Sequence, residues 1–405
     1  MKILVLTSRF PYPLEKGDKL RIYYQIRELH RAGYEVQLVS LTEEKVKKAD
    51  YQQVKAFCSK IFVFRITRFS VFIHAVLNIF KGIKRPFQVA YFYDFTVKNA
   101  IDQIIETEKP DHIHCHLARM SAYVEHKNLP KTLDFMDAFG AGTKRRADIS
   151  PFYIRPFWHI EARLMQRYEQ YMASKFDFST IISKQDKERL TLNADSAPVQ
   201  VIPNGVDTDF FNIVDFQNQN NAIEKKYDIC FVGNLGYYSN VEAVRFLIKK
   251  IVPLVKAQKP DVTILLAGAR PTTEIWGFTN DHIKVIGWLD DIREAYAQSR
   301  ILVAPLMHGI GQQNKILEAM AMHVPVVTTT RVNNAIGSTA EKDILLADTE
   351  GVFAEQILKL LQNIDLQNII SENGRVFVEQ NYSWQQATRP FIELLNEKMI
   401  EKQPN

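Results

Sequence analysis

The 405-residue chain is poor in cysteine, glycine and proline, with 3 Cys, 16 Gly and 16 Pro. Cys58, Cys115 and Cys230 are too few and too widely spaced for a disulfide framework, and they lack histidines at zinc-ligand spacing. We therefore expect reduced thiols in a cytoplasmic protein. Because 46% of the residues are hydrophobic, a collagenous or disordered chain is also excluded.

Long hydrophobic runs are missing as well. The longest apolar region, residues 71–80, is interrupted by His74 and Asn78, whereas a membrane span needs about 20 apolar residues. The apolar start at residues 3–6 is too short for the core of an export signal. The sequence thus predicts a cytoplasmic protein, either free or peripheral on the inner face of the cell membrane.

Acidic residues are scarce in one part of the chain. Residues 1–200 hold 32 Lys+Arg against 22 Asp+Glu, whereas residues 201–405 hold 19 against 24. Residues 51–100 contain eight cations and one anion, Asp94, among many aromatic residues. Such a strip suits an anionic partner, either a nucleic acid or a membrane surface. No nucleic-acid-binding module is visible, so we expect no nucleic acid.

Within this strip, the apolar residues of 69–80 recur at helical spacing. The cations that flank them lie at residues 65–85 and are Arg65, Arg68, Lys81, Lys84 and Arg85. One interpretation is a helix that lies on an anionic bilayer and brings the protein to a lipid-linked substrate. The other is a helix buried against its own sheet, with solvated ends.

Short β-branched runs alternate with helical stretches, which is typical of parallel sheets built from βαβ units. The expected strands are residues 2–6, 35–40, 61–64, 112–114, 132–135, 178–182 and 199–202, then 228–232, 262–267, 283–286, 301–304, 326–328 and 344–346. This pattern predicts an α/β protein with two doubly wound parallel sheets in series.

The domain boundary is expected at the turn Pro203-Asn204-Gly205. The Asn- and Gln-rich residues 212–222 resemble a linker. We predict domains at 1–205 and 206–383, and a final helix at about 384–405 that packs back onto the first. Ligands of open parallel sheets bind beyond the carboxyl ends of the strands, so two such edges suit a two-part substrate.

The richest motif is a strand, a glycine-containing loop, a helix and a strand at residues 302–327. Gly309 and Gly311 allow a close backbone approach to a ligand, and the following helix start attracts phosphate. Lys315 and Glu318 lie three apart and share one helix face. They are either a diphosphate cation and a ribose carboxylate, or a surface ion pair beside an ordinary loop.

The sequence around Glu318-Ala319-Met320-Ala321 resembles the donor-site signature of family 4 glycosyltransferases. Further similar segments are residues 201–207, Phe231-Val232-Gly233-Asn234, residues 182–186, and Phe10-Pro11 through Gly17-Asp18 to Arg21. These five motifs, in the family order, cover nearly the whole chain. The resemblance implies a GT-B fold, with two Rossmann-like domains facing a cleft and a nucleotide-sugar donor held mainly by the second.

The same resemblance implies the site residues. Glu318 would bind the donor ribose, Lys315 the diphosphate, and the loop of Gly17 and Asp18 would face the diphosphate from the first domain. The complete set of expected donor-binding residues is Gly17, Asp18, Arg21, Asn204, Gly233, Asn234, Gly309, Gly311, Gln313, Asn314, Lys315 and Glu318. Without the resemblance, Gly17 would be assigned to a plain turn.

Three positions depart from the family pattern. Ile310 replaces a glutamate that often touches the donor sugar, and Asn234 stands where many members have a diphosphate-binding cation. His323-Val324 replaces the frequent glycine before Pro325-Val326-Val327. We expect Lys315 to compensate for the missing cation.

The first domain is expected to receive the acceptor. His112, His114 and His116 alternate along one strand. They are either buried structural residues or, for His114 or His116, contacts in a cleft. Metal binding is less favoured, because no carboxylate or Cys/His cluster completes a site. Asp137 follows the next strand and either orients the acceptor hydroxyl or caps the helix after it. The predicted catalytic residues are therefore Asp137, His116 and Lys315, with no metal or other cofactor.

The resemblance implies a retaining glycosyltransferase that uses a nucleotide-diphosphate sugar and a glycan or lipid-linked acceptor in cell-surface or exopolysaccharide synthesis. A sugar-nucleotide epimerase of the same architecture and a non-catalytic nucleotide-sugar-binding protein remain as alternatives. A nicotinamide dehydrogenase is disfavoured because neither sheet opens with Gly-x-Gly-x-x-Gly.

Overall fold

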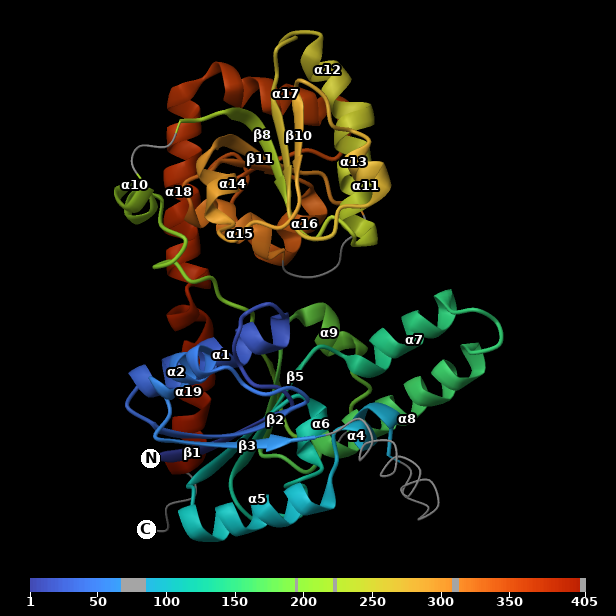
Figure 1. The fold of residues 1–405 in the computed structure, drawn as a ribbon, viewed down its shortest axis with the longest axis vertical. Helices are drawn as coiled ribbons and strands as arrows, with labels where there is room; N and C mark the ends of the chain where they lie inside the picture. The colour runs from blue at the N-terminus through green and yellow to red at the C-terminus, as the bar shows by residue number, and fades with distance from the viewer. Residues whose placement is uncertain (67–84, 194–195, 221–223, 308–312, 401–405) are drawn as a thin grey trace. The chain divides into compact units, whose positions relative to one another are not determined.

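The computed structural model describes residues 1–66, 85–193, 196–220, 224–307 and 313–400 (Figure 1). The chain divides into two compact units. The first comprises Met1–Asn204 and Thr388–Asn405, and the second comprises Gly205–Ala387. The first unit is therefore discontinuous, because part of it comes from the end of the chain.

A parallel sheet forms the core of the first unit, and among the described residues its order is β3-β2-β1-β4-β5-β6-β7. Its strands are β1 (Lys2–Thr7), β2 (Glu35–Thr42), β3 (Lys60–Arg65), β4 (His112–His116), β5 (Lys131–Met136), β6 (Phe178–Ile181) and β7 (Val199–Val201). Leu4, Val39 and Ile113 are fully buried. Burial on both faces explains the apolar run of β1, whereas the equally buried β4 carries three histidines.

The second unit contains another parallel sheet, with the order β10-β9-β8-β11-β12-β13 in the described part of the chain. Its strands are β8 (Tyr227–Val232), β9 (Ile264–Ala267), β10 (Ile283–Ile286), β11 (Ser299–Ala304), β12 (Val326–Thr328) and β13 (Leu345–Leu346). Every predicted strand is present to within two residues at each end, so the predicted pair of doubly wound sheets is confirmed.

The strand order reverses once in each sheet, between β1 and β4 and between β8 and β11. At such a reversal, the loops after the two neighbouring strands turn to opposite faces of the sheet. Ligands of open parallel sheets bind in the space that this leaves beyond the carboxyl ends of the strands. The two reversal points therefore locate the regions of each unit in which functional residues are sought.

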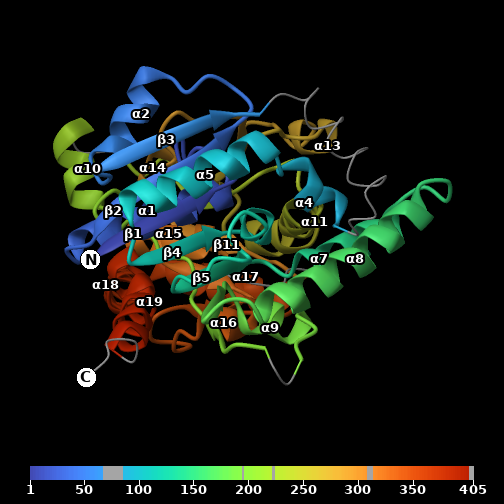
Figure 2. The same cartoon turned by 90° about the horizontal axis from the view of Figure 1, so that it is seen from below.

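Helices of the first unit include a long antiparallel pair. The described helices between residues 17 and 189 are α1 (Gly17–Arg31), α2 (Lys48–Lys55), α4 (Phe87–Tyr91), α5 (Phe95–Glu108), α6 (Ala118–Ser121), α7 (Phe139–Ile149), α8 (Arg155–Ala173) and α9 (Lys184–Arg189). Helices α7 and α8 run side by side as a hairpin that extends away from the sheet in both views (Figures 1 and 2). No helix in the described ranges combines the length and apolar character needed to span a bilayer.

The last helix, α19 (Trp384–Ile400), completes the first unit from residue 388 onward. The Phe391 ring is fully buried and lies 4.8 Å from the His114 ring and 6.1 Å from the Phe178 ring. The Tyr34 hydroxyl donates a 2.5 Å hydrogen bond to Asn396 Oδ1. Helix α19 thus covers one face of the first sheet.

The remaining helices belong to the second unit. They are α10 (Ile213–Asn220), α11 (Tyr238–Phe246), the π-helix η1 (Leu247–Ile251), α12 (Val252–Lys256), α13 (Thr273–Trp276), α14 (Arg293–Ala297), α15 (Asn314–Ala321), α16 (Thr330–Ile336), α17 (Glu350–Gln362) and α18 (Ile364–Tyr382).

Helix α10 corrects the prediction of a linker at 212–222. Asn212 Oδ1 accepts hydrogen bonds from the Val214 and Asp215 amides at the start of this helix. Phe216 is 2% exposed, and the Arg293 guanidinium lies 4.7 Å from its ring centroid. One apolar anchor and one helix-starting asparagine therefore order a segment whose composition alone is typical of a linker.

Candidate functional site

A pocket of about 360 Å³ lies in the second unit, next to the strand-order reversal of its sheet. Its walls come from the loops that follow β8 and β9 and from the start of α15. Five of the residues expected from the sequence line it: Gly233, Asn234, Asn314, Lys315 and Glu318. Folding therefore brings together residues that are far apart in the chain.

Glu318 is positioned by a buried tyrosine. The Tyr296 hydroxyl donates a 2.8 Å hydrogen bond to Glu318 Oε2, and Tyr296 itself is fully buried. Burial raises the pKa of Glu318 above its ordinary value, although Tyr296 and Lys315 both favour the ionised form. The tyrosine fixes the carboxylate and engages one of its two oxygens.

Lys315 lies one helical turn before Glu318 and also lines the pocket. Its Nζ donates a 2.6 Å hydrogen bond to Asn240 Oδ1 and lies 5.1 Å from the centroid of the Phe231 ring. Burial lowers the pKa of Lys315 to about 8, while Glu318 opposes this shift. The ammonium is thus poorly solvated and oriented, which favours an interaction with a polyanion.

Two glycines let backbone segments meet beside Lys315. A Cβ on Gly268 would lie 1.8 Å from the Gly233 carbonyl oxygen, and a Cβ on Gly233 would lie 3.1 Å from Lys315 Cε. Both have positive φ, +136° for Gly268 and +156° for Gly233. The loops after β8 and β9 therefore approach so closely that a side chain on Gly268 cannot be accommodated.

The other residues predicted in this region have different positions. Asn234 Oδ1 accepts a 3.0 Å hydrogen bond from the Gly236 amide, so its side chain shapes the turn after β8. Gln313 is the N-cap residue of α15 but makes no side-chain capping bond. Gly309 and Gly311, with the departure Ile310, lie outside the described residues.

Three pocket residues, Asn240, Trp288 and Gly268, were not singled out from the sequence, and neither was Tyr296, which lies buried behind Glu318. Tyr296 and Asn240 contact Glu318 and Lys315 from other helices, and nothing in their local sequence signals this. Gly268 had a usable signal, since it directly follows the apolar strand Ile264–Ala267 as Gly233 follows β8.

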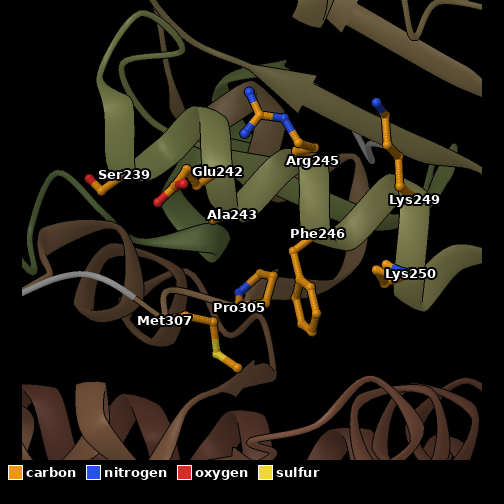
Figure 3. Close-up of a pocket in the computed structure, with 9 residues that line it drawn as sticks. All are labelled: Ser239, Glu242, Ala243, Arg245, Phe246, Lys249, Lys250, Pro305 and Met307. Carbon is orange, nitrogen blue, oxygen red and sulfur yellow. The ribbon is translucent and has the colours of Figure 1, made fainter.

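Another pocket of the second unit, of about 280 Å³, lies between α11 and the end of β11 (Figure 3). Phe246 points toward Pro305 and Met307, whereas Arg245 points away from them (Figure 3). Arg245 is engaged by Glu274 through two 2.6 Å contacts. None of the predicted site residues lines this pocket, so we assign the candidate site to the pocket of Lys315 and Glu318.

In the first unit, Gly17 and Asp18 begin α1 at the carboxyl edge of the sheet. A Cβ on Gly17 would lie 3.2 Å from Met136 Cε. Arg9 Nη1 lies 2.5 Å from Asp18 Oδ2. Burial alone would raise the pKa of Asp18, but the ion pair with Arg9 outweighs it and lowers the pKa. Asp18 is thus an ionised partner of Arg9.

Arg21 and Asn204, two of the expected donor-binding residues, take part in a buried network. Arg21 is fully buried, and its Nε and Nη2 donate hydrogen bonds of 2.5 and 3.2 Å to the two oxygens of Asp134. Its Nη1 donates to Asn204 Oδ1 at 3.0 Å. Both side chains are turned to protein partners, and their expected donor contact stays a prediction.

His116 ends β4 and Asp137 follows the neighbouring β5, at the same edge of the sheet. His116 is 2% exposed, and its Nδ1 lies 3.6 Å from Asp134 Oδ2, too far for a hydrogen bond. Asp137 is exposed, but the protein around it limits hydration and, with Asp186 nearby, raises its pKa. It does not cap α7, since the N-cap residue is Ala138 and no side-chain capping bond forms.

The other two histidines of β4 are structural. His112 Nε2 and His114 Nδ1 lie 3.1 and 2.8 Å from the hydroxyl of Thr132. Burial lowers the pKa of His114 to about 3, so this ring is neutral. Across the part of the chain that the structure describes, no group of three His, Cys, Asp or Glu residues is arranged to hold a metal ion.

Most of the basic aromatic strip at 65–85 lies outside the described residues, which omit 67–84. Arg85, at its end, pairs with Glu125 at 3.0 Å and lies 4.2 Å from the Tyr93 ring centroid. The two interpretations of the strip therefore stay predictions.

Comparison with known proteins gives a consistent result. A family model described as Glycosyltransferase Family 4 matches residues 20–210, and one described as Glycosyl transferases group 1 matches residues 226–363. This chain therefore belongs to the family 4 glycosyltransferases, whose two domains these models describe.

Relatives of this glycosyltransferase include an uncharacterized 44.6 kDa protein in the cps region of Klebsiella pneumoniae, 22% identical over 94% of this chain and 96% of the relative. Capsular polysaccharide biosynthesis glycosyltransferase CapM of Staphylococcus aureus is 29% identical, over 42% of this chain and 48% of the CapM chain.

Solved structures of similar fold include sucrose-phosphate synthase from Thermosynechococcus elongatus, with a TM-score of 0.64, 15% identity and coverage of 99% of this chain and 100% of that one. Anabaena HepE in complex with UDP-glucose has a TM-score of 0.62 and 14% identity, and the match covers 98% of this chain and 100% of HepE. These similarities confirm the predicted GT-B architecture of the glycosyltransferase.

One departure from the glycosyltransferase signature has a structural explanation. His323 takes the place of the frequent glycine, and its φ is +52°. The chain turns there from the end of α15 toward β12, and the Val324 amide donates a 2.9 Å hydrogen bond to the Ala319 carbonyl. The position requires a left-handed residue, which explains the glycine elsewhere in the family.

Replacing Arg21 by Met should lower the free energy of unfolding of the first unit by about 3–5 kcal/mol, because Asp134 would remain as an unpaired buried carboxylate. The double substitution R21M/D134L should cost less than the sum of the two single ones. Hydrogen exchange of β1, β4 and β5 under increasing denaturant measures both quantities. As a control, K98M breaks the part-exposed Lys98–Asp102 pair and should cost about 1 kcal/mol or less. Additive effects at Arg21 and Asp134 would contradict the coupling.

Proposed function

We propose that this glycosyltransferase moves a sugar, with retention of anomeric configuration, from a nucleotide-diphosphate sugar to a glycan or lipid-linked acceptor in cell-surface polysaccharide synthesis. The observation that carries the proposal is the pair Lys315 and Glu318, which lines a pocket at the strand-order reversal. The HepE complex with UDP-glucose supports a uridine nucleotide as the donor carrier. The names of the Klebsiella and Staphylococcus relatives support the polysaccharide product.

Each polar group of the pocket suits one part of such a donor. Tyr296 engages Oε2 of Glu318, which leaves the other carboxylate oxygen for a ribose hydroxyl. Lys315 provides a cation for the diphosphate. Trp288 lines the pocket and is 66% exposed, so its indole offers a flat surface on which a nucleobase can stack.

In the proposed reaction, the bond from the anomeric carbon to the diphosphate breaks while the acceptor oxygen bonds to the same face of that carbon. Negative charge grows on the diphosphate, and Lys315 and the free amides at the start of α15 stabilise it. The acceptor proton passes to the leaving phosphate. We assign Asp137 to orienting the acceptor hydroxyl and the nearly buried His116 to positioning, and no metal is required.

Replacing Glu318 by Gln or Ala should raise the donor Kd about tenfold or more, because a charge-assisted hydrogen bond to the ribose is lost. Thermal stabilisation by a panel of nucleotide sugars, beginning with UDP-glucose, measures donor affinity. E372Q removes an exposed carboxylate in the same unit and is the matched control. Unchanged donor affinity and turnover in E318A would rule out this site. Hydrolysis or epimerisation of the bound donor without transfer would instead favour the epimerase, and donor binding without turnover would favour the non-catalytic binding protein.

Donor affinity should fall as the pH rises through about 8, because Lys315 then loses its proton and with it the attraction to the diphosphate. Titration calorimetry from pH 6 to pH 10 measures this. K315R should keep its charge and flatten the profile above pH 8, whereas K315M should bind weakly at every pH. A wild-type profile that stays flat up to pH 10 would contradict the assignment of Lys315.

A membrane contact also belongs to the proposal, and the tip of the α7–α8 hairpin suits it. Ile149, Phe152 and Tyr153 are 87%, 85% and 71% exposed. The exposed cations near this tip are Lys144, Arg145, Arg146 and Arg155, with Asp148 as the nearby acid. Exposed apolar side chains beside cations are what an anionic bilayer surface attracts. We propose that the tip, together with the strip at 65–85, brings the enzyme to a lipid-linked acceptor.

The protein should sediment with anionic liposomes at low salt and be released at high salt, because the attraction is partly electrostatic. The triple variant I149S/F152S/Y153S should bind about tenfold more weakly. I364S/I369S removes similarly exposed side chains from the second unit and should bind as the wild type does. Loss of binding only on replacing Arg68, Lys81 and Lys84 would assign the contact to the strip alone, and absence of binding at low salt would contradict both surfaces.

A further inference from the structure

The first unit has a pocket of its own, of about 560 Å³, at the carboxyl edge of its sheet. Loops after β1 and β2, helices α4 and α6, and the hairpin helices α7 and α8 all contribute to its walls. Aromatic rings are prominent in it, including Phe92, Phe139 and Trp158. None of the residues assigned above to the donor or to catalysis lines this pocket.

A desolvated cation lies in this pocket. Arg119 is 9% exposed, and its guanidinium lies 4.9 Å from the Phe92 ring centroid and 5.0 Å from that of Phe139. Within the described ranges, no carboxylate lies at ion-pair distance from Arg119, and its buried Nε has no hydrogen-bond acceptor. Residues 67–84, outside those ranges, contain no Asp or Glu. Burial lowers the pKa of Arg119 to about 10, and Arg9 adds to this effect, while the more distant Asp18 opposes it.

Other charges around the pocket are partly compensated. Arg9 pairs with Asp18, and the Arg146 guanidinium lies 3.9 Å from the Trp158 ring centroid. Glu43 also lines the pocket and accepts a 3.1 Å hydrogen bond from the Tyr91 hydroxyl. Three guanidinium groups thus face one pocket. Arg119 is the most buried of them, and its positive charge has no carboxylate at ion-pair distance among the described residues. Burying a charge is costly unless a counter-charge is close, so this arrangement needs an anion to complete it.

The walls are fixed before any ligand arrives. Glu161 of α8 accepts hydrogen bonds of 2.8 and 3.1 Å from the Phe87 and Gln88 amides at the start of α4. Glu169, also of α8, accepts from the Gly140 amide at the start of α7. Gln88 Nε2 donates to Thr143 Oγ1 at 3.0 Å, which links α4 to α7. Three helices around Arg119 are therefore joined by specific bonds, as in a preorganised binding site.

We propose that this pocket binds the acceptor through an anionic oxygen group, a phosphate ester or a carboxylate, with Arg119 as its central ligand. The guanidinium fork matches either group, and the aromatic rings offer faces for an attached sugar. The inference rests on the proposed function, which supplies the acceptor. Since α7 and α8 run from this pocket to the exposed hairpin tip, a phosphate that links an acceptor to lipid fits the site (Figures 1 and 2).

The test uses titration calorimetry on the full chain in a K315M background, so that phosphate binding at Lys315 does not interfere. The probes are inorganic phosphate, dihexanoyl phosphatidic acid, glucuronate and the uncharged methyl glucoside. We expect an anion to bind with a Kd in the millimolar range, and R119M to weaken it about tenfold or more. R167M removes an exposed arginine of α8 and should bind as the parent does. Binding of the phosphates alone identifies the lipid linker as the source, and binding of glucuronate identifies an acidic sugar.

Stability provides a second readout. Because Arg119 is a buried cation without a carboxylate partner, R119M without ligand should have a Tm equal to or higher than that of the parent. A marked loss of Tm would make Arg119 a structural residue and overturn the proposal, as would anion binding that is absent or unchanged in R119M. Nucleotide-sugar binding by R119M with Lys315 intact should equal that of the wild type. If no donor binds the wild type, the proposed function fails while the anion titration still decides the role of Arg119.

Discussion

The buried ion pair between Arg21 and Asp134 is the interaction on which the first unit depends. Asp134 lies within the central strand β5, and burial alone would raise its pKa, but Arg21 and His116 hold the pKa well below its ordinary value. Arg21 comes from α1, and it also donates to the Pro203 carbonyl and Asn204 where the chain leaves the unit. One carboxylate thus orders α1, the end of β5 and, through Arg21, the exit of the chain, because an uncompensated charge there would be too costly.

The second unit also contains a lysine and a glutamate held by neighbouring side chains, but this pair lines a pocket. Glu318 is oriented by a buried tyrosine, and Lys315 by Asn240, but both side chains remain partly exposed in a pocket. Asp134 and Arg21, by contrast, are completely buried. Where all partners are protein groups, the pair stabilises the fold. Where a part of each group still faces a pocket, it can exchange solvent for a ligand.

Sequence patterns predicted the two sheets well, because strands buried on both faces are mostly apolar and the helices between them are amphipathic. They also placed Lys315 and Glu318 on one helix face, since helical spacing is local. They did not reveal that Arg21 is turned inward, because its partner Asp134 is 113 residues away. Tyr296, Asn240 and the buried Arg119 were missed for the same reason: their roles arise from contacts between segments that are distant in the chain.

The discontinuity of the first unit has a consequence for the order in which the protein is made. Residues up to 204 leave the ribosome early, but the ring of Phe391, which covers His114 and Phe178, is synthesised only after the whole second unit. During that interval an apolar face of the first sheet lacks its covering helix and is open to wrong partners. The second unit, Gly205–Ala387, is continuous and needs no later residues. The half of the enzyme that begins first is therefore completed only after the second, and its uncovered face is exposed to aggregation throughout that interval.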